Sequence, residues 1–359
     1  MAGKFERKPF SQIDLNDPFF DTLKADYPEF EKVWFPKGIR EHREALIFSD
    51  EYGLGAFIAV KEENEPIELQ ETTLPAKSRL KISTLRLAER YRGQRLGEGA
   101  LGILLWDWQH SKKEEIYLTV FPSHVDVISQ VERFGFIPAG HNPRGEIVFI
   151  RSRREIDFSD PYKSFPFISP DFKKGGYLII EDGYHDTLFP YSELQNVFQK
   201  QLEADAANGV SKVYIGQLWQ PHYQIGEPIF IYRKHTGDGV KRYRSCLTSF
   251  CVVTGVIAIK RNNMALCTVE EFLKLAGNKS IFPQEELINK YHTYRNLTII
   301  QMLYCGYFGA GNNINLAWLD DHSLWNLNHD YPLTTRLTQQ QCIEILKQGQ
   351  IDINDVFGR

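Results

Sequence analysis

The stretch Leu85–Leu105, LRLAERYRGQRLGEGALGILL, decides the fold of the first half of the chain. It begins in a β-rich run, passes through a polar turn with several glycines, and ends in apolar residues at helical spacing. A glycine-bearing turn that leads into a helix N-terminus exposes backbone amides in a positive local field. The stretch therefore predicts an anion site suited to phosphate.

The spacing of the glycines excludes two common phosphate-binding motifs. The turn has neither the G-x-x-x-x-G-K-[ST] pattern of P-loop nucleotidases nor the G-x-G-x-x-G pattern of dinucleotide-binding folds. Its glycines are Gly93, Gly97, Gly99 and Gly102. Positive charge comes instead from Arg90, Arg92 and Arg95, so the anion site is predicted without either motif.

The segments around the turn alternate between strand and helix. In chain order we predict a hairpin, a strand, a helix, a strand, a helix and a β pair, at residues 43–61, 79–88, 100–113, 114–121, 124–134 and 137–151. This order is typical of an α/β or α+β fold. We expect a mixed sheet flanked by helices.

The turn resembles the acyl-CoA-binding motif of the GNAT superfamily of N-acetyltransferases. That motif reads R/Q-x-x-G-x-G/A between a strand and a long helix. Arg92 and Gly97 match its first and last positions, and Arg95 stands at its middle glycine. The ending VERFGF, 131–136, is close to the family's aromatic-x-x-x-Gly-Phe. The likeness covers roughly residues 10–151.

The resemblance implies acetyl-CoA as co-substrate and no metal. It places the pantetheine arm along Leu85–Leu87, in a gap between two strands, and the pyrophosphate on the amides from Arg92 to Glu98. The Leu87 amide would then steady the developing oxyanion. The cofactor-binding residues implied are Leu85, Leu87, Arg92, Gly93, Gln94, Arg95, Leu96, Gly97, Glu98 and Ser123.

The general acid is where the sequence departs from the family. Many members have a tyrosine four residues before the glycine of Gly-Phe, and this chain has Val131. Tyr117, Ser123 and His124 are candidates to replace it, and Glu89 is a candidate base acting through water. Each also fits a structural role, such as a capping histidine or a strand aromatic. Catalysis by another group, acid-free thiolate release and binding without turnover all remain open.

Residues 151–176 divide the chain. They hold a basic cluster, three prolines and a Gly-Gly pair, and they lack helical or strand periodicity. The length of 359 residues also suggests two domains, at about 150 residues each. We predict domains at 1–155 and 175–359 with a linker at 156–174.

The second half resembles the PUA-like superfamily, in which ASCH and EVE domains bind RNA or modified bases. The likeness rests on the order of two strands, a helical insert, a strand, and a proline-containing loop with a closing helix. The segments are 226–234, 245–257, 278–291, 315–325 and 331–349. The short G-x-K-x-x-x-x-R pattern of ASCH domains is missing, which argues against an amidohydrolase. We expect a small β-barrel with helices.

A PUA-like domain would take a base or nucleotide by stacking and edge hydrogen bonds. Aromatic candidates are Trp219, Tyr223, Tyr232, Trp318 and Trp325. The candidate nucleic-acid-binding residues are Arg233, Lys234, Lys241, Arg242 and Arg244, which fit a solvated hairpin tip around 236–239 equally well. Asp320, Asp321 and His322 are adjacent in the chain and cannot easily converge on one ion, so we predict no metal site.

Composition excludes several classes of protein. The net charge is -4, and the residues after 160 carry equal numbers of basic and acidic side chains, which argues against nonspecific coating of nucleic acid. The sequence has no apolar run long enough for a membrane span and no signal-peptide core in MAGKFERKPF. Five cysteines without a C-x-x-C pair argue against disulfides. We expect a cytoplasmic protein without a membrane partner.

Three functions follow from these features. The first is an acetyl-CoA-dependent N-acetyltransferase that acylates an amine on an RNA-linked substrate, such as tRNA, aminoacyl-tRNA or an RNA-associated protein. The second is an RNA- or modified-base-binding regulatory protein with a degenerate acyl-CoA-binding domain. The third is a small-molecule amine acetyltransferase. The acceptor, the acyl length and the oligomeric state stay open at this point.

Overall fold

A computed structural model describes residues 5–195, 199, 204–325 and 335–358. The chain divides into two compact units. The first comprises Met1–Leu101 and Lys112–Glu155, and the second comprises Gly102–Ser111 and Ile156–Arg359. The stretch 156–174, which we predict to be a linker, belongs to the second unit, where it forms the short helix α5 (Pro161–Ser164) and buries several apolar side chains.

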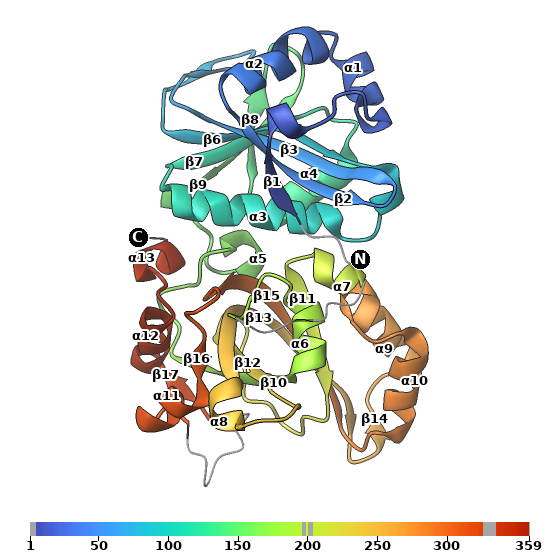
Figure 1. Ribbon diagram of the computed structural model, residues 1–359, viewed down its shortest axis with the longest axis vertical. Coiled ribbons are helices and arrows are strands. Elements are labelled where there is room, and N and C mark those ends of the chain that lie inside the picture. Colours follow the sequence, from blue (N-terminus) through green and yellow to red (C-terminus); the bar gives the residue numbers. More distant parts are fainter. Residues whose placement is uncertain (1–4, 196–198, 200–203, 326–334, 359) are drawn as a thin grey trace. The chain divides into compact units, whose positions relative to one another are not determined.

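The first unit is built on a seven-stranded mixed sheet of order β1-β2-β3-β6-β7-β9-β8 (Figure 1). Only β6 and β7 are a parallel pair, and the other neighbours are antiparallel. Between β3 and β6 in the chain, β4 and β5 form a separate two-stranded sheet. The strands are β1 (Glu6–Pro9), β2 (Glu44–Asp50), β3 (Gly53–Glu63), β4 (Ile67–Glu68), β5 (Thr73–Leu74), β6 (Arg79–Leu87), β7 (Glu115–Val120), β8 (Ile137–His141) and β9 (Ile147–Ser152).

Helices lie on both sides of this sheet. In Figure 1, α1 and α2 are on one side and α3 crosses the other. The helices are α1 (Asp21–Asp26), α2 (Phe35–Arg40), α3 (Leu96–Ser111) and α4 (Val125–Arg133), with 3-10 turns at Phe10–Gln12, Pro18–Phe20, Glu89–Tyr91 and Arg153–Glu155 and a π-helical turn at Phe30–Trp34. The predicted hairpin, strands and helices are present in the predicted order, and the mixed sheet flanked by helices is confirmed.

Aromatic packing fixes the helical segment onto the first sheet. Phe10, Phe20, Phe35 and Phe57 are each 2% exposed or less, and Phe57 projects from β3 into the other three rings. Buried aromatic side chains contribute large apolar areas and favourable ring contacts. The segment before β2 is therefore part of the core of the first unit.

The second unit contains an eight-stranded sheet with the path β11-β15-β13-β12-β10-β17 and with β14 and β16 paired to β13. Among the described residues this path does not close on itself, so the predicted barrel is not what these pairings form. The strands are β10 (Lys174–Glu181), β11 (Ser211–Gly216), β12 (Pro228–Lys234), β13 (Cys246–Arg261), β14 (Met264–Ala265), β15 (Leu297–Tyr307), β16 (Ile314–Asn315) and β17 (Leu337–Thr338).

Short helices surround the second sheet. Besides α5 they are α6 (Asp182–Leu188), α7 (Asp205–Asn208), α8 (Lys241–Arg244), α9 (Val269–Ala276), α10 (Gln284–Thr293), α11 (Leu316–Asp321), α12 (Gln339–Gln348) and α13 (Ile353–Phe357). The closing helix is present as α12, whereas most of the proline-containing loop before it lies outside the described residues. None of the described helices is both long and apolar enough to cross a membrane.

The strand predicted at 315–325 is wrong, because most of that segment is the helix α11 and the turn after it. Asn315 caps this helix by accepting a hydrogen bond from the Trp318 amide at 2.9 Å. Leu316 and Leu319 are buried at helical spacing. The strand that follows the helical insert is β15, which sequence reasoning missed.

Candidate functional site

Strands β6 and β7 are paired along only part of their length. Their parallel register ends at Ile82 opposite Leu118, whereas β6 continues to Leu87 and β7 continues to Val120. On its other side β6 stays paired with β3 as far as Leu87. The carboxyl-terminal parts of β6 and β7 therefore diverge, and β6 has an open edge there.

A β-bulge at Ser83 lies where the pairing ends. In the register of β3 with β6, Val60 faces Ile82 and the preceding residue, Ala59, faces Thr84, so Ser83 is an extra residue. The Ser83 hydroxyl donates to the Ala59 carbonyl at 3.0 Å. A bulge bends its strand and increases the local twist. The bulge therefore gives a physical cause for the divergence of β6 from β7.

The bulge also changes which side chains of β6 face each side of the sheet. Leu80 and Ile82 are buried on one face. Beyond the extra residue the alternation is displaced by one position, so Leu85 and Leu87 lie on the same face as Leu80 and Ile82. Arg86 lies on the opposite face, where its Nε donates to the Phe19 carbonyl at 3.0 Å. The apolar side of β6 thus continues past the point where β7 leaves it.

The main chain of the open edge can bind an extended ligand. The Ala88 amide donates to the Gly55 carbonyl of β3 at 2.8 Å. Because successive residues of a strand direct their N–H and C=O groups to opposite sides, those of Leu85 and Leu87 point away from β3. They face the gap beside β7. An extended chain with amide groups can pair with such an edge as an additional strand.

The turn after β6 adopts left-handed backbone conformations at two positions. Gly93 has a φ of +77°, and Arg95, the N-cap of α3, has φ +62° and ψ 10°. Glycine adopts this conformation without steric strain, whereas for a residue with a side chain the left-handed conformation is less favourable by about 1–2 kcal/mol. The middle position of the motif therefore favours glycine for a reason of backbone geometry, and Arg95 adopts the same conformation despite its side chain.

The first turn of α3 presents main-chain amides beside this loop. Its first hydrogen bond runs from the Gly99 amide to the Arg95 carbonyl at 3.1 Å, so the amides of Leu96 and Gly97 precede the intrahelical bonds. Arg95 does not cap the helix with its side chain, which pairs with Glu98 at 3.0 Å. The positive end of the helix dipole adds to these donors. The arrangement suits a phosphate group.

The arginines of the turn differ in what they contact. Arg90 donates twice to the Asp50 carboxylate, at 3.1 and 2.9 Å, and the Tyr91 hydroxyl donates to the same group. Burial acts to raise the pKa of Asp50, but these hydrogen bonds hold it below its ordinary value. Burial and Asp50 raise the pKa of Tyr91 to about 12. Arg92 is exposed and forms no ion pair with an acidic side chain among the described residues, so its charge is available to a ligand.

Gly97 lies at a close approach of three elements. A Cβ at this position would lie 3.0 Å from Cδ1 of Leu87 at the end of β6 and 3.2 Å from Oε1 of Gln130 on α4. Such contacts are tighter than side chains normally tolerate. Any larger side chain would fill the space where the end of β6, the start of α3 and α4 meet.

The structure separates Tyr117 from the other catalytic candidates. Glu89 follows β6, and Ser123 and His124 follow β7, so all three stand beyond the carboxyl ends of the diverging strands, and all three are exposed. Tyr117 lies in the paired part of β7, is 2% exposed, and donates its hydroxyl to Glu63. Burial and this hydrogen bond raise the pKa of Tyr117 above its ordinary value. Tyr117 is a core residue that is held neutral.

Sequence reasoning missed Gln130. The apolar face of α4 is formed by Val127, Val131 and Phe134, and Gln130 falls on that face. A polar residue on an apolar helix face was the available signal. Val131, which replaces the expected tyrosine, is 2% exposed and belongs to the core.

The predicted basic patch of the second half is largely neutralised by acidic residues. Arg233 is buried and donates to both oxygens of Asp186, at 2.7 and 2.8 Å. Burial acts to raise the pKa of Asp186, but hydrogen bonds from Arg233 and His185 lower it to about 2. His185 is fully buried and also contacts the Thr248 hydroxyl at 2.7 Å. This group is a structural ion pair in the interior of the unit.

The other basic candidates lie at the surface. Lys234 pairs with Glu181 at 3.2 Å. Arg242 pairs with Asp320 at 2.6 Å and with Asp321 at 2.8 Å, the two acidic residues that precede His322 in the sequence. Arg244 donates to the Asp238 carbonyl at 2.7 Å, and Lys241 is exposed. The described residues include no cluster of His, Cys, Asp and Glu that could hold a metal ion.

Most aromatic candidates of the second half belong to its core. Tyr223, Tyr232 and Trp325 are each at most 7% exposed, and the rings of Tyr232 and Trp325 lie 4.5 Å apart. Trp318 stacks on His322 with ring centroids 4.0 Å apart. Trp219 is 43% exposed and has Arg261 over its ring. Of this set, Trp219 is the residue most available to stack on a ligand.

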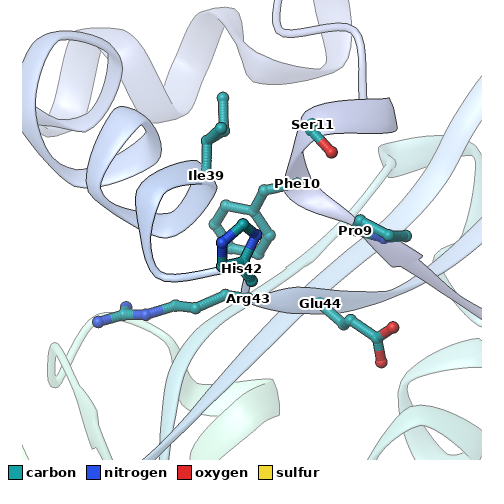
Figure 2. A pocket seen from close by; sticks show the side chains of 7 residues that line it. All are labelled: Pro9, Phe10, Ser11, Ile39, His42, Arg43 and Glu44. Atoms are coloured by element: carbon teal, nitrogen blue, oxygen red, sulfur yellow. The ribbon is translucent and has the colours of Figure 1, made fainter.

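The first unit also has a surface hollow, which is lined by none of the predicted site residues. Figure 2 shows the side chains that line it, which come from the end of β1 and the turn after it, from the end of α2 and the loop after it, and from the start of β2. Its residues are Pro9, Phe10, Ser11, Ile39, His42, Arg43 and Glu44. Arg43 is paired with Glu41, and no predicted site residue lines the hollow. It contributes nothing to the candidate site.

Comparison with known proteins adds a structural likeness for the first half. No family model matches the chain, and no curated protein matches its sequence. Solved structures similar to the N-terminal 42% of the chain are GNAT N-acetyltransferases.

Three of these structures illustrate the likeness, each aligning with 42% of this chain and 99% of its own. Naa50 of Arabidopsis thaliana in complex with a bisubstrate CoA analogue is 20% identical, with a TM-score of 0.29. The paia N-acetyltransferase of Thermoplasma acidophilum with coenzyme A is 13% identical, with a TM-score of 0.31. A chain of the NatC complex bound to Gag peptide and CoA is 18% identical, with a TM-score of 0.28. At such values the likeness carries no function by itself.

Proposed function

We propose that the first unit binds acyl-CoA and transfers its acyl group to an amine. The observation that carries this proposal is the divergence of β6 from β7 after Ile82, with a glycine-containing turn and the N-terminus of α3 at the end of the gap. The gap offers main-chain partners to an extended arm, and the helix end offers partners to a diphosphate.

The residues present fit such a ligand. The main-chain groups of Leu85 and Leu87 face the gap and suit the amides of a pantetheine arm. The amides of Leu96 and Gly97, with the exposed Arg92, suit the pyrophosphate. At Gly97 a side chain would fill the approach between these two parts, and glycine leaves it open.

The reaction draws on main-chain and side-chain groups at the carboxyl ends of β6 and β7. When bound, acyl-CoA supplies an acyl group as a thioester. Leu87 lies beside the helix end, so of the two amides that face the gap that of Leu85 is farther from the pyrophosphate position, and it can donate to the thioester oxygen that gains negative charge. Glu89, exposed directly after the strand, is a base that takes the proton of the attacking amine through water. As the amine nitrogen bonds to the acyl carbon the carbon–sulfur bond breaks, and His124 or Ser123, on the β7 side, would donate a proton to the departing CoA thiolate.

A second function is favoured by the side chains at and around the expected general acid. The helix α4 contains no tyrosine, Val131 is buried in place of one, and Tyr117 is committed to Glu63. These residues fit a unit that binds acyl-CoA without turning it over. In that case the protein would respond to acyl-CoA rather than consume it.

As the acceptor of the acyl group we propose first an amine on an RNA-linked substrate, with small-molecule amines as the alternative. The pairing of Arg233, Lys234 and Arg242 with acidic residues lowers the net positive charge available to RNA. Trp219 and Lys241 remain as exposed groups that can stack on a base and contact a phosphate.

Two measurements on the full chain test the proposal. Isothermal titration with CoA should show binding, and absence of binding would overturn both functions. Thiol release from acetyl-CoA should then occur with a mixed pool of amines, and it should rise on addition of bulk tRNA if the acceptor is RNA-linked. Binding without thiol release under any of these conditions selects the second function.

A further inference from the structure

Gln130 carries a polar group that the fold leaves unused. It lies on α4, and its side-chain amide packs against Gly97 at the start of α3. Its Nε2 atom is buried, and in the described part of the chain it has no hydrogen-bond acceptor. A buried donor without an acceptor is destabilising, and native proteins satisfy nearly all of them with protein, water or ligand.

The position of this amide connects it to the gap beside β6. A Cβ at Gly97 would be 3.2 Å from Oε1 and 3.8 Å from Nε2 of Gln130, and 3.0 Å from Cδ1 of Leu87. Leu87 is the last residue of β6, and its main chain faces the open edge. The amide therefore lies where the strand gap meets the helix end, between the positions assigned to the arm and to the pyrophosphate.

The chemistry of the group indicates which part of a ligand it contacts. A carboxamide is neutral and donates two N–H bonds, so it pairs well with a neutral carbonyl oxygen. Phosphate oxygens are better served by the helix end and by Arg92. Leu87 and Gly97, which approach Gln130 at this point, have no charged side chain.

We propose that Gln130 donates a hydrogen bond to an amide carbonyl of the pantetheine arm. The inference rests on the proposed function, because it needs acyl-CoA in the gap. Gln130 is then a binding residue that fixes the depth of the arm. In this assignment α4 places Gln130 at the gap and Val131 in the core. The helix then supplies a residue that binds the ligand, and it supplies no tyrosine that could act as general acid.

Two ligands and two variants test the assignment by titration calorimetry. Adenosine 3′,5′-bisphosphate lacks the pantetheine arm, whereas CoA contains it. Gln130→Leu and the unbranched, near-isosteric Gln130→Met should each weaken CoA binding about tenfold, as expected for a lost hydrogen bond in a buried site, and should leave the bisphosphate unchanged. Ser129→Ala, at an exposed neighbour on the same helix, is the control and should bind both ligands as the parent chain does.

The outcomes distinguish this inference from the proposed function. If the parent chain binds no CoA, the proposed function fails and the inference fails with it. If the parent binds CoA and both Gln130 variants bind it equally well, solvent satisfies the amide and the inference alone is overturned. Equal weakening of CoA and the bisphosphate would also overturn it, because the contact would then not be to the arm.

Discussion

Each unit has one parallel strand pair among the residues that the structure describes, and the two pairs end differently. β6 and β7 separate after Ile82 although both strands continue. β10 and β12 stay paired to their last residues, Glu181 opposite Lys234. Ligands of α/β proteins bind beyond the carboxyl ends of parallel strands. The first pair leaves that place open, and the second does not.

The position of a bulge accounts for this difference. In the first unit the extra residue, Ser83, is in β6 itself. In the second unit Ile231 faces Ser249 and Tyr232 faces Leu247, so the extra residue, Thr248, is in the neighbouring strand β13. A bulge bends the strand that carries it. It therefore separates a parallel pair when it lies in one of the two members.

The chain's own side chains fill the end of the closed pair. Asp182, directly after β10, accepts hydrogen bonds from the Thr236 amide at 3.1 Å and the Thr236 hydroxyl at 2.6 Å. It also lies 3.1 Å from Nδ1 of His235. After β6 the corresponding place has a glycine turn and helix amides. A similar strand arrangement thus becomes a structural junction in one unit and a candidate ligand site in the other.

Removing the buried carboxylate beside the closed pair should have the largest effect. Asp186→Ala leaves Arg233, on β12, as a buried charge without its partner, and should destabilise the second unit by about 3–5 kcal/mol. Urea denaturation followed by circular dichroism measures this loss. CoA binding to the folded variant should remain, and its disappearance would show that the candidate site depends on the Asp186–Arg233 pair.

The same carboxylate gives a pH dependence with a definite sign. Burial acts to raise the pKa of Asp186, but the hydrogen bonds from Arg233 and His185 lower it from 3.8 to about 2. The stabilisation is complete above about pH 4 and is lost as the pH falls toward 2. In denaturation curves measured between about pH 4 and about pH 2, the free energy of unfolding of Asp186→Ala should fall less with decreasing pH than that of the parent chain.

Filling the open end should abolish ligand binding. Gly97→Trp puts an indole between Leu87 and Gln130 and should weaken CoA binding by at least about a hundredfold, through steric exclusion of the ligand. Gly183→Trp is the matched control, because Gly183 is in the helix after β10 and has open space around its Cβ position. Equal CoA binding by the parent and Gly97→Trp would show that the gap is not the site.

Removing positive charge at the open end should have a smaller effect. Arg92→Ala should weaken CoA binding about tenfold, as expected for loss of one exposed charge-assisted contact, and the difference should shrink with added salt. Titration at two ionic strengths measures it. Arg40→Ala, an exposed arginine at the end of α2, is the control. A salt-independent loss in Arg92→Ala would point to a change in the turn and not to a lost phosphate contact.

Much of the first unit could be predicted because its signals are local. The two β-rich runs of the hairpin with the turn between them, the glycine turn and the apolar spacing of α3 each depend on neighbouring residues. The partners of the turn could not be predicted in the same way. Arg90 pairs with Asp50, which is 40 positions away, and no pattern in a single sequence links two such residues.

The second unit shows where patterns mislead. Arg233 belongs to a basic cluster in the sequence, yet it is buried against Asp186. A strand places successive side chains on opposite faces, so adjacent charges such as Arg233 and Lys234 can have opposite environments. The segment Leu316–Asp321 carries apolar residues that fit either a strand or a helix, and the Asn315 cap decides for the helix.

The bulge at Ser83 makes the candidate site sensitive to the deletion of a single codon. The apolar residues of β6 are at positions 80, 82, 85 and 87, so their spacing of two residues is interrupted once, at the bulge. Loss of the single codon for Ser83 would restore a strict alternation of apolar residues along β6 and remove the bend. Every other residue of the site would keep its identity. The site would then depend on the length of one strand as much as on any side chain, and a deletion of three nucleotides could close it.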